Sequence, residues 1–239
     1  MQQIGLVTGA DRGLGLALAE GLLERGWHVF AGQYMAAWPS LDELASMHPG
    51  KLTVVPLDVA DTASVRAAAE AASDRVDRLD LVISNAGVSS RVMKRPISEP
   101  QDYDEMHRLY DVNALGAIRV VEAFLPLMQR GEGKRLCFVS SEAGSIGKAY
   151  RTSWYSYCMS KAALNMAVKI LHNDLHAQGY TFRLYHPGWM RTYMSGTKGT
   201  RADMEPEEAA AKALPILLNR RADEDRLVMV DYNGVEWPF

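Results

Sequence analysis

The sequence predicts an α/β fold in which a doubly wound parallel sheet of about seven strands is covered by helices on both faces. Short apolar runs of strand length alternate with longer helical patterns along the chain, an order that builds parallel sheets. A glycine-rich turn also follows the first apolar run and opens the first helical pattern, as at the start of many such sheets. At 239 residues, we expect one domain spanning residues 1–239.

Seven segments have the apolar composition of buried strands. They cover residues 4–8, 28–32, 52–56, 79–84, 136–140, 182–186 and 227–230. Helical patterns lie between them, and the first covers residues 13–25 and stops before Gly26, a residue that suits the end of a helix. The segments least typical of regular structure are 89–99, 144–154 and 193–205. Two of them follow predicted strand ends, where open parallel sheets bind ligands.

The composition argues against several classes of partner. A formal net charge of -3 gives no strong field for nucleic acid. The start of the chain lacks a charged leader, and no apolar run reaches the roughly 18 residues of a membrane helix. Cys137 and Cys158 lie apart with no Cys/His cluster, which argues against disulfides and a metal site. We therefore expect a cytoplasmic protein that binds small molecules, without a metal, nucleic acid or membrane partner.

The glycine-rich turn is the first candidate binding site. It consists of Thr8, Gly9, Ala10, Asp11, Arg12, Gly13, Leu14 and Gly15. Glycines let the backbone approach a pyrophosphate closely, and the first N–H groups of the following helix point at it. A tight turn without a ligand is the alternative. The position between a strand and a helix favours dinucleotide binding.

The glycine spacing resembles the Thr-Gly-x-x-x-Gly-x-Gly pattern of the short-chain dehydrogenase/reductase family, which has a Rossmann fold. Further landmarks follow in the family's order: Asn85-Ala86-Gly87, Asn113, Ser140-Ser141, Tyr157-x-x-x-Lys161 and Pro187-Gly188. Together they cover most of the chain. Three segments, Trp154-Tyr155-Ser156-Tyr157, His186-Pro187-Gly188-Trp189 and the ending Asp231-Tyr232-Asn233-Gly234-Val235-Glu236-Trp237-Pro238, resemble the C-factor and sniffer-type carbonyl reductases within this family.

Tyr157 and Lys161 are the candidate acid/base pair. Their spacing of four places a phenol and an ammonium on one helical face, although chance also produces such pairs. An ammonium beside a phenol stabilises the phenolate, whose ordinary pKa is about 10. The resemblance implies that Tyr157 is the general acid in carbonyl reduction and the general base in alcohol oxidation. It also implies that Lys161 lowers the pKa of Tyr157 and binds the nicotinamide ribose.

The resemblance assigns two further catalytic residues. Ser141 would donate a hydrogen bond to the substrate oxygen, and Asn113 would hold a water that links Lys161 to solvent. Ser140 is the rival of Ser141, because neighbours on a strand point to opposite sides. Asn113 has a rival role as a helix-start residue with a local backbone bond.

The second predicted strand is followed by Gln33 and Tyr34, where NAD-preferring sites commonly place an acid. Arg12 resembles the basic residue that faces the 2′-phosphate in NADP-dependent members of the family. We therefore expect NADP(H), with NAD(H) as the alternative because Tyr34 stands where many NADP-dependent relatives have a second Arg. Arg12 could also be a solvated loop cation.

The remaining cofactor contacts follow from the resemblance alone. Asp58 would lie beside the adenine ring, although it could instead cap the next helix, for which Asp61 is better placed. Thr192 would bind the nicotinamide carboxamide. The full expected set is Gly9, Asp11, Arg12, Gly13, Leu14, Gly15, Tyr34, Asp58, Val59, Asn85, Ala86, Gly87, Tyr157, Lys161, Pro187, Gly188 and Thr192.

The sequence thus predicts an oxidoreductase that transfers hydride between a nicotinamide and a small carbonyl or secondary alcohol substrate. The alternative is a dinucleotide-binding signalling or regulatory protein in which turnover is incidental. The resemblance also implies a homodimer or homotetramer. Apolar residues that could line a substrate pocket, or simply pack, are Trp189, Met190, Tyr193 and Met194.

Overall fold

A computed structural model describes residues 1–194, 199 and 202–239. Its strands form one sheet in the order β3-β2-β1-β4-β5-β6-β7-β8. The strands are β1 (Ile4–Val7), β2 (His28–Gln33), β3 (Leu52–Pro56), β4 (Leu81–Ser84), β5 (Arg135–Val139), β6 (Thr181–His186), β7 (Met229–Asp231) and β8 (Glu236–Trp237). All neighbours pair in parallel except β7 and β8. The predicted α/β fold is confirmed, with one short antiparallel edge strand added.

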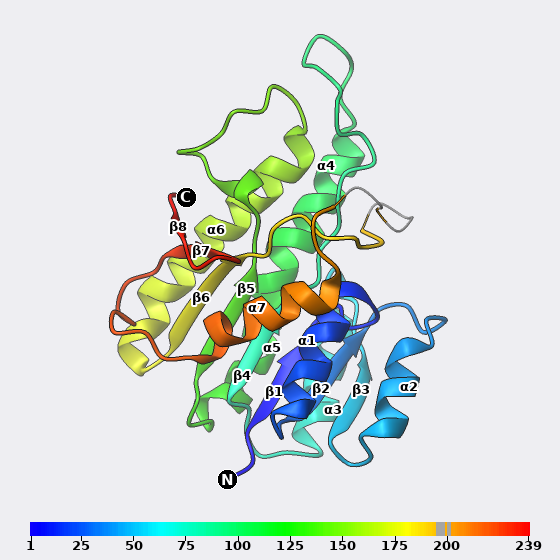
Figure 1. Cartoon of the computed structure of the whole chain (residues 1–239), viewed down its shortest axis with the longest axis vertical. Helices are drawn as coiled ribbons and strands as arrows, with labels where there is room; N and C mark the ends of the chain where they lie inside the picture. Colours follow the sequence, from blue (N-terminus) through cyan, green and yellow to red (C-terminus); the bar gives the residue numbers. More distant parts are fainter. Residues whose placement is uncertain (195–198, 200–201) are drawn as a thin grey trace.

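Helices cover both faces of the sheet (Figure 1). They are α1 (Gly13–Glu24), α2 (Ser40–Met47), α3 (Thr62–Ser73), α4 (Tyr103–Tyr110), α5 (Gly116–Gln129), α6 (Tyr155–Leu175) and α7 (Pro206–Leu218). Successive strand residues enter opposite layers: Leu6 packs with α3, α5 and α6, whereas Val7 packs with α1, α2 and α7. This alternation is the two-residue period of a strand. It produces two apolar cores, one on each face.

From β1 the strand order runs through β2 to β3 at one edge of the sheet. The chain then crosses back, and β4 pairs with the other side of β1. Such a reversal opens a crevice at the carboxyl ends of the two strands, where α/β proteins bind ligands. The connections after β4 and β5 both rise beyond this edge, at the top of Figure 1. The glycine turn and these two connections therefore gather at the edge of the sheet where a ligand is expected.

Three short irregular helical turns interrupt the regular pattern of the described chain. A π-helical turn, η1 (Asp111–Leu115), joins α4 to α5, and a 3₁₀ turn, η2 (Glu142–Gly144), follows β5. A second 3₁₀ turn, η3 (His176–Gln178), ends α6. No helix in the described part of the chain is long and apolar enough to cross a membrane.

Candidate active site

The glycine turn packs too closely for side chains. Gly9 has φ of 62°, which a residue with a side chain adopts only at a cost. A Cβ added to Gly15 would lie 2.1 Å from the Gly9 carbonyl oxygen. The N-cap of α1, Arg12, makes no side-chain capping bond, and the first turn has no acidic residue. These features leave backbone donors at a positive helix end for an anion, so the turn fits a pyrophosphate.

Asn85 fastens the glycine turn to the end of β4. Its Nδ2 donates to the carbonyl oxygens of Thr8 (3.0 Å) and Gly9 (3.2 Å). Thr8 Oγ1 accepts in turn from the backbone N–H groups of Asn85 and Ala86, both at 3.0 Å. Thr8 belongs to the predicted glycine turn but not to the expected cofactor contacts, although its place at the head of the glycine pattern could have revealed this role.

Asp11 and Arg12 have different surroundings at the end of β2. Asp11 is buried, and its Oδ1 accepts from the backbone N–H groups of Tyr34 (2.7 Å) and Met35 (3.2 Å). The Arg12 guanidinium lies 2.6 Å from the Met35 sulfur and 4.8 Å from the centre of the Trp38 ring. The Tyr34 side chain is exposed. Asp11 therefore holds the loop after β2 against the glycine turn. The Arg12 guanidinium lies over that loop, at the β2 end of the crevice.

Asp58 and Val59 follow β3 at the same edge of the sheet. Asp58 Oδ1 accepts from the backbone N–H of Ala60 at 2.9 Å. The cap of α3 is Asp61, whose side chain accepts from the Ala63 N–H, as expected from the sequence. Val59 is buried. The helix-cap alternative for Asp58 is therefore wrong.

Tyr157 and Lys161 lie on the first turns of α6 and are both buried. The Lys161 Nζ is 5.8 Å from the centre of the Tyr157 ring and donates to the Val139 carbonyl oxygen at 3.0 Å. Ser141 lies close enough to the Tyr157 phenol to lower its pKa. Ser140 instead donates to the buried Asn165 Oδ1 at 2.6 Å. Of the two serines, Ser141 is therefore the one that the structure brings to Tyr157.

Burial dominates the ionisation of this pair. It raises the pKa of Tyr157 to about 12, and the nearby Ser141 hydroxyl opposes the rise only in part. It also lowers the pKa of Lys161 to about 8. Lys161 does not offset this rise in the structure, so its expected effect on the pKa of Tyr157 stays a prediction. The ammonium is directed at a backbone carbonyl, and desolvation of the phenolate is the larger effect.

Asn113 lies in the π-helical turn η1, a kind of distortion that is frequent at functional sites. Its Nδ2 donates to the Val88 carbonyl (2.9 Å) and Ser160 Oγ (3.0 Å), and its Oδ1 accepts from the Val88 N–H (2.8 Å). A Cβ added to Gly87 would lie 3.2 Å from this Oδ1 and 3.6 Å from the Lys161 Nζ. Asn113 and Lys161 therefore meet beside Gly87, and the backbone bonds of Asn113 join it to the distant Val88 rather than to its own helix start, as the local alternative would require.

The connection after β6 returns to the glycine turn. Pro187 and Gly188 begin it, and a Cβ added to Gly13 would lie 3.6 Å from the Thr192 methyl group. Among the predicted pocket residues, Met194 reaches Gly87, whereas Tyr193 packs edge-on against Trp38 with ring centres 5.0 Å apart. Trp189 is largely exposed and Met190 pairs with Met204. Part of the 193–205 segment lies outside the described residues.

Trp154 is a neighbour of Tyr157 that the sequence did not single out for a role. Its ring stacks on the Tyr157 ring with centres 4.5 Å apart and planes 17° from parallel. Its position three residues before Tyr157 is the only sequence signal. The stacked ring contributes to the burial that raises the pKa of Tyr157.

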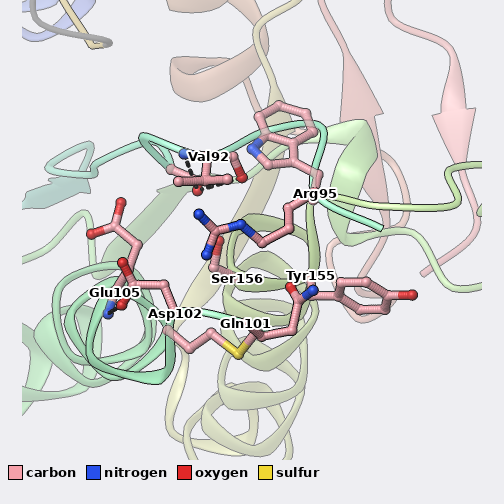
Figure 2. Close-up of a pocket in the computed structure, with 10 residues that line it drawn as sticks. Val92, Arg95, Gln101, Asp102, Glu105, Tyr155 and Ser156 are labelled. Carbon is pink, nitrogen blue, oxygen red and sulfur yellow. Dashed lines mark hydrogen bonds between the residues drawn. The ribbon is translucent and has the colours of Figure 1, made fainter. Parts of the chain in front are cut away.

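Trp154 also lines a small cavity (Figure 2). Its lining residues are Ser90, Val92, Arg95, Gln101, Asp102, Glu105, Met106, Trp154, Tyr155 and Ser156. In Figure 2 the phenol of Tyr155 points away from the other labelled side chains. Since Ser141, Tyr157 and Lys161 are not part of this lining, the cavity is separate from the catalytic candidates.

The comparisons with known proteins agree with this geometry. The pattern of the short chain dehydrogenase family matches residues 3–203. The chain belongs to this short-chain dehydrogenase/reductase family. It is therefore an oxidoreductase of the family, as its motifs predict. In the described part of the chain, no group of three or more His, Cys, Asp or Glu residues could hold a metal ion.

Three similar proteins place this short-chain dehydrogenase more closely. The C-signal protein of Myxococcus xanthus is 35% identical over 161 residues, which covers 67% of this chain and 93% of that protein. An NADPH-bound carbonyl reductase from chicken fatty liver has a TM-score of 0.87 and 30% identity, over 100% of this chain and 99% of that one. The carbonyl reductase Sniffer of D. melanogaster has a TM-score of 0.87 and 25% identity, over 100% of both chains. The resemblance to C-factor and sniffer-type proteins is confirmed.

Proposed function

We propose that this protein is an NADP-dependent carbonyl reductase in which Tyr157 is the general acid. One observation carries the proposal: the buried Tyr157 phenol has the buried Lys161 ammonium 5.8 Å from its ring centre and the Ser141 hydroxyl nearby, at the same edge of the sheet as the glycine turn. A bound nicotinamide would supply the hydride in reduction and accept it in oxidation. The similar structure with bound NADPH supports the choice of cofactor.

The roles of the chain's own groups follow from their surroundings. Ser141 donates to the carbonyl oxygen of the substrate and stabilises the negative charge that develops there. Tyr157 gives its proton to that oxygen. Because burial keeps its pKa at about 12, the phenol is protonated near neutral pH, which suits reduction better than oxidation. Lys161, with a pKa near 8, stabilises the phenolate that remains, and Asn113 positions the backbone around it.

The cofactor contacts are proposed on the same basis. The N-terminus of α1 would bind the pyrophosphate, and Arg12 would face the 2′-phosphate. In the part of the chain that the structure describes, no carboxylate pairs with Arg12, so its charge is available to an anion. The other contacts are Asp58 and Val59 on the adenine side, Asn85 to Gly87 along one wall, and Thr192 opposite Gly13.

We also propose a cytoplasmic homo-oligomer formed by one domain over residues 1–239. The free cysteines Cys137 and Cys158 suit a reducing compartment. Met159, Met166 and Ile170 are exposed apolar residues on α6. Their spacings of seven and four place them along one side of the helix, which supports a helix-mediated contact between subunits.

The experiment that tests the function starts with cofactor binding. Fluorescence titration with NADPH and NADH should show tighter binding of NADPH. Reduction and oxidation assays with aldehydes, ketones, quinones and secondary alcohols should then give turnover that Tyr157→Phe abolishes while NADPH still binds. Near wild-type turnover by Tyr157→Phe would show that the catalytic assignment is wrong.

A second candidate is a dinucleotide-binding signalling protein, which the 35% identity to the C-signal protein favours. A protein that only senses the dinucleotide does not need Asn113, Ser141, Tyr157 and Lys161 together. NADPH binding without turnover on the whole carbonyl panel would support this candidate over the reductase.

A further inference from the structure

An ion pair lies beside the proposed catalytic residues Ser141 and Tyr157. It joins Glu142, the first residue of η2, to Arg151 in the connection that leads to α6. The Arg151 Nη2 is 2.5 Å from the Glu142 Oε1, and the two side chains are 23% and 26% exposed. The pair is thus partly withdrawn from water, where charges interact more strongly than at a free surface.

Glu142 also contacts the proposed substrate-binding hydroxyl. Its Oε2 accepts a hydrogen bond from Ser141 Oγ at 3.3 Å. Ser141 Oγ accepts in turn from the backbone N–H of Ala143 at 3.1 Å. The Ala143 N–H therefore holds the Ser141 oxygen in place, while Glu142 takes the single hydroxyl hydrogen, which must turn from the carboxylate to the carbonyl oxygen when a substrate binds.

Arg151 contacts the ring that covers Tyr157. Its guanidinium lies 5.2 Å from the centre of the Trp154 ring, within the range of a cation–π contact. Trp154 has φ of 69° and ψ of 35°, a left-handed conformation that is unfavourable for a bulky residue. Such a conformation persists only where neighbouring contacts hold it. The Arg151 contact and the stack on Tyr157 are two such contacts.

These contacts form one continuous path around the phenol. Resting on the proposed roles of Ser141 and Tyr157, we propose that Glu142 and Arg151 are positioning residues. Glu142 holds the Ser141 hydroxyl until the substrate oxygen replaces it as the acceptor, Arg151 holds the Trp154 ring against Tyr157, and the opposite charges of Glu142 and Arg151 balance each other beside the phenol.

Several other ionisable groups face Tyr157. Lys161 and Cys158 come from its own helix. Glu142 raises the pKa of Tyr157 and Arg151 lowers it, both by less than burial does. His186 on β6 also interacts with both members of the ion pair. Of these groups, only Glu142 and Arg151 form an ion pair in which each partner acts on Tyr157 in the opposite direction.

This opposition gives a signature that a merely structural pair would not show. Glu142→Gln leaves Arg151 uncompensated and favours the phenolate, so alcohol oxidation at a fixed pH below the Tyr157 pKa should speed up. Arg151→Met leaves Glu142 uncompensated and should slow it. We expect changes of about threefold in opposite directions. The double variant should return close to the wild-type rate, and Arg151→Lys should restore the pH profile.

The experiment measures kcat against pH for these variants with NADP and a secondary alcohol. Glu208→Gln, which breaks an exposed ion pair with Lys212 on α7, is the matched control and should not shift the profile. A second readout needs no turnover. The ultraviolet absorbance of tyrosinate is titrated with pH for each variant with and without Tyr157→Phe, and the difference between the two curves gives the ionisation of Tyr157. NADPH affinity, measured in parallel, shows whether each variant is folded.

Unshifted profiles in both variants, or shifts in the same direction, would overturn the proposal if Tyr157→Phe is inactive. If Tyr157→Phe stays active, the proposed function fails instead, and this inference fails with it. If the Tyr157 ionisation shifts in opposite directions in the two single variants and returns to the wild-type position in the double variant, the proposal is supported whichever substrate the enzyme uses.

Discussion

Strands β5 and β6 have buried cations near both ends, and the two ends treat them differently. Near the amino ends, Arg135 and Arg183 are both buried and share Glu224, with nitrogen to Oε1 distances of 3.2 and 2.6 Å. At the carboxyl end of β5, the equally buried Lys161 has no carboxylate partner in the described structure and donates a hydrogen bond to the backbone carbonyl of Val139. At the amino ends, a carboxylate pairs with the buried cations. At the carboxyl end, the buried Lys161 ammonium has no such partner in the described structure, so it can lose its proton more easily.

The arginine cluster uses its donors fully. Besides Glu224, the two guanidinium groups donate to the last carbonyl oxygens of α7 and its C-cap, those of Ile216, Leu217, Leu218 and Asn219. A helix C-terminus carries partial negative charge, so cations stabilise it. Desolvation raises the pKa of Glu224, but the hydrogen bonds from Arg183 and the Arg221 N–H and the charges of Arg183 and Arg135 outweigh it. The pKa of Glu224 therefore falls to about 2. These hydrogen bonds and ion pairs fix α7 against the sheet. At the carboxyl ends of the strands, Tyr157 and Lys161 have fewer partners and stay available for proton transfer.

The largest expected effect is at the carboxyl end. Tyr157→Phe removes one hydroxyl from a site in which the phenol is the proposed proton donor. We expect kcat for carbonyl reduction to fall about 10²- to 10⁴-fold with little change in NADPH affinity or melting temperature. Steady-state kinetics and thermal unfolding measure both. Tyr155→Phe is the matched control and should keep its activity. Equal losses of kcat in Tyr157→Phe and Tyr155→Phe would show that Tyr157 is not the specific proton donor.

The opposite result is expected at the amino end. Glu224→Gln leaves two buried arginines without their carboxylate, so the free energy of unfolding should fall by about 3–5 kcal/mol while kcat is retained. Because the folded pKa of Glu224 is about 2 against an ordinary 4.5, its contribution is present above the ordinary value and lost as the pH falls toward the folded one.

Urea unfolding at about pH 7 and about pH 3 measures this contribution, and the gap between wild type and Glu224→Gln should narrow at the lower pH. Glu208→Gln, on an exposed pair of α7, should leave the unfolding free energy nearly unchanged. A loss of activity in Glu224→Gln at full stability would contradict the division of roles between the two ends.

The direction of the Tyr157 pKa shift predicts the pH dependence of turnover. With a pKa of about 12, the phenolate fraction rises about tenfold per pH unit below that value. Alcohol oxidation, which needs the phenolate as base, should therefore accelerate from about pH 7 to about pH 10, whereas carbonyl reduction should stay nearly level. Initial rates in both directions test this. An oxidation rate that levels off near pH 8 would mean that Lys161 lowers the pKa during turnover, as the sequence predicts.

The contrast between the ends also separates what the sequence could predict from what it could not. Alternating apolar runs and the glycine turn predicted the sheet, because both are local patterns. The strand Glu236–Trp237 was missed because two residues carry no period. The raised pKa of Tyr157 depends on burial under Trp154, and the Asp11 bonds to the loop after β2 depend on tertiary packing. Neither is encoded in spacing along the chain.

The smallest expected effect concerns the cofactor end of the crevice. Among the residues that the structure describes, Arg12 is held by the Met35 sulfur and the Trp38 ring, weak partners that a phosphate could replace. Arg12→Ala should weaken NADPH binding by about 1–2 kcal/mol, the scale of one partly exposed charge-assisted hydrogen bond. NADH lacks the 2′-phosphate and serves as the internal control in fluorescence titrations. Equal losses for both cofactors would mean that Arg12 shapes the glycine turn, and that the preference for NADP has another origin.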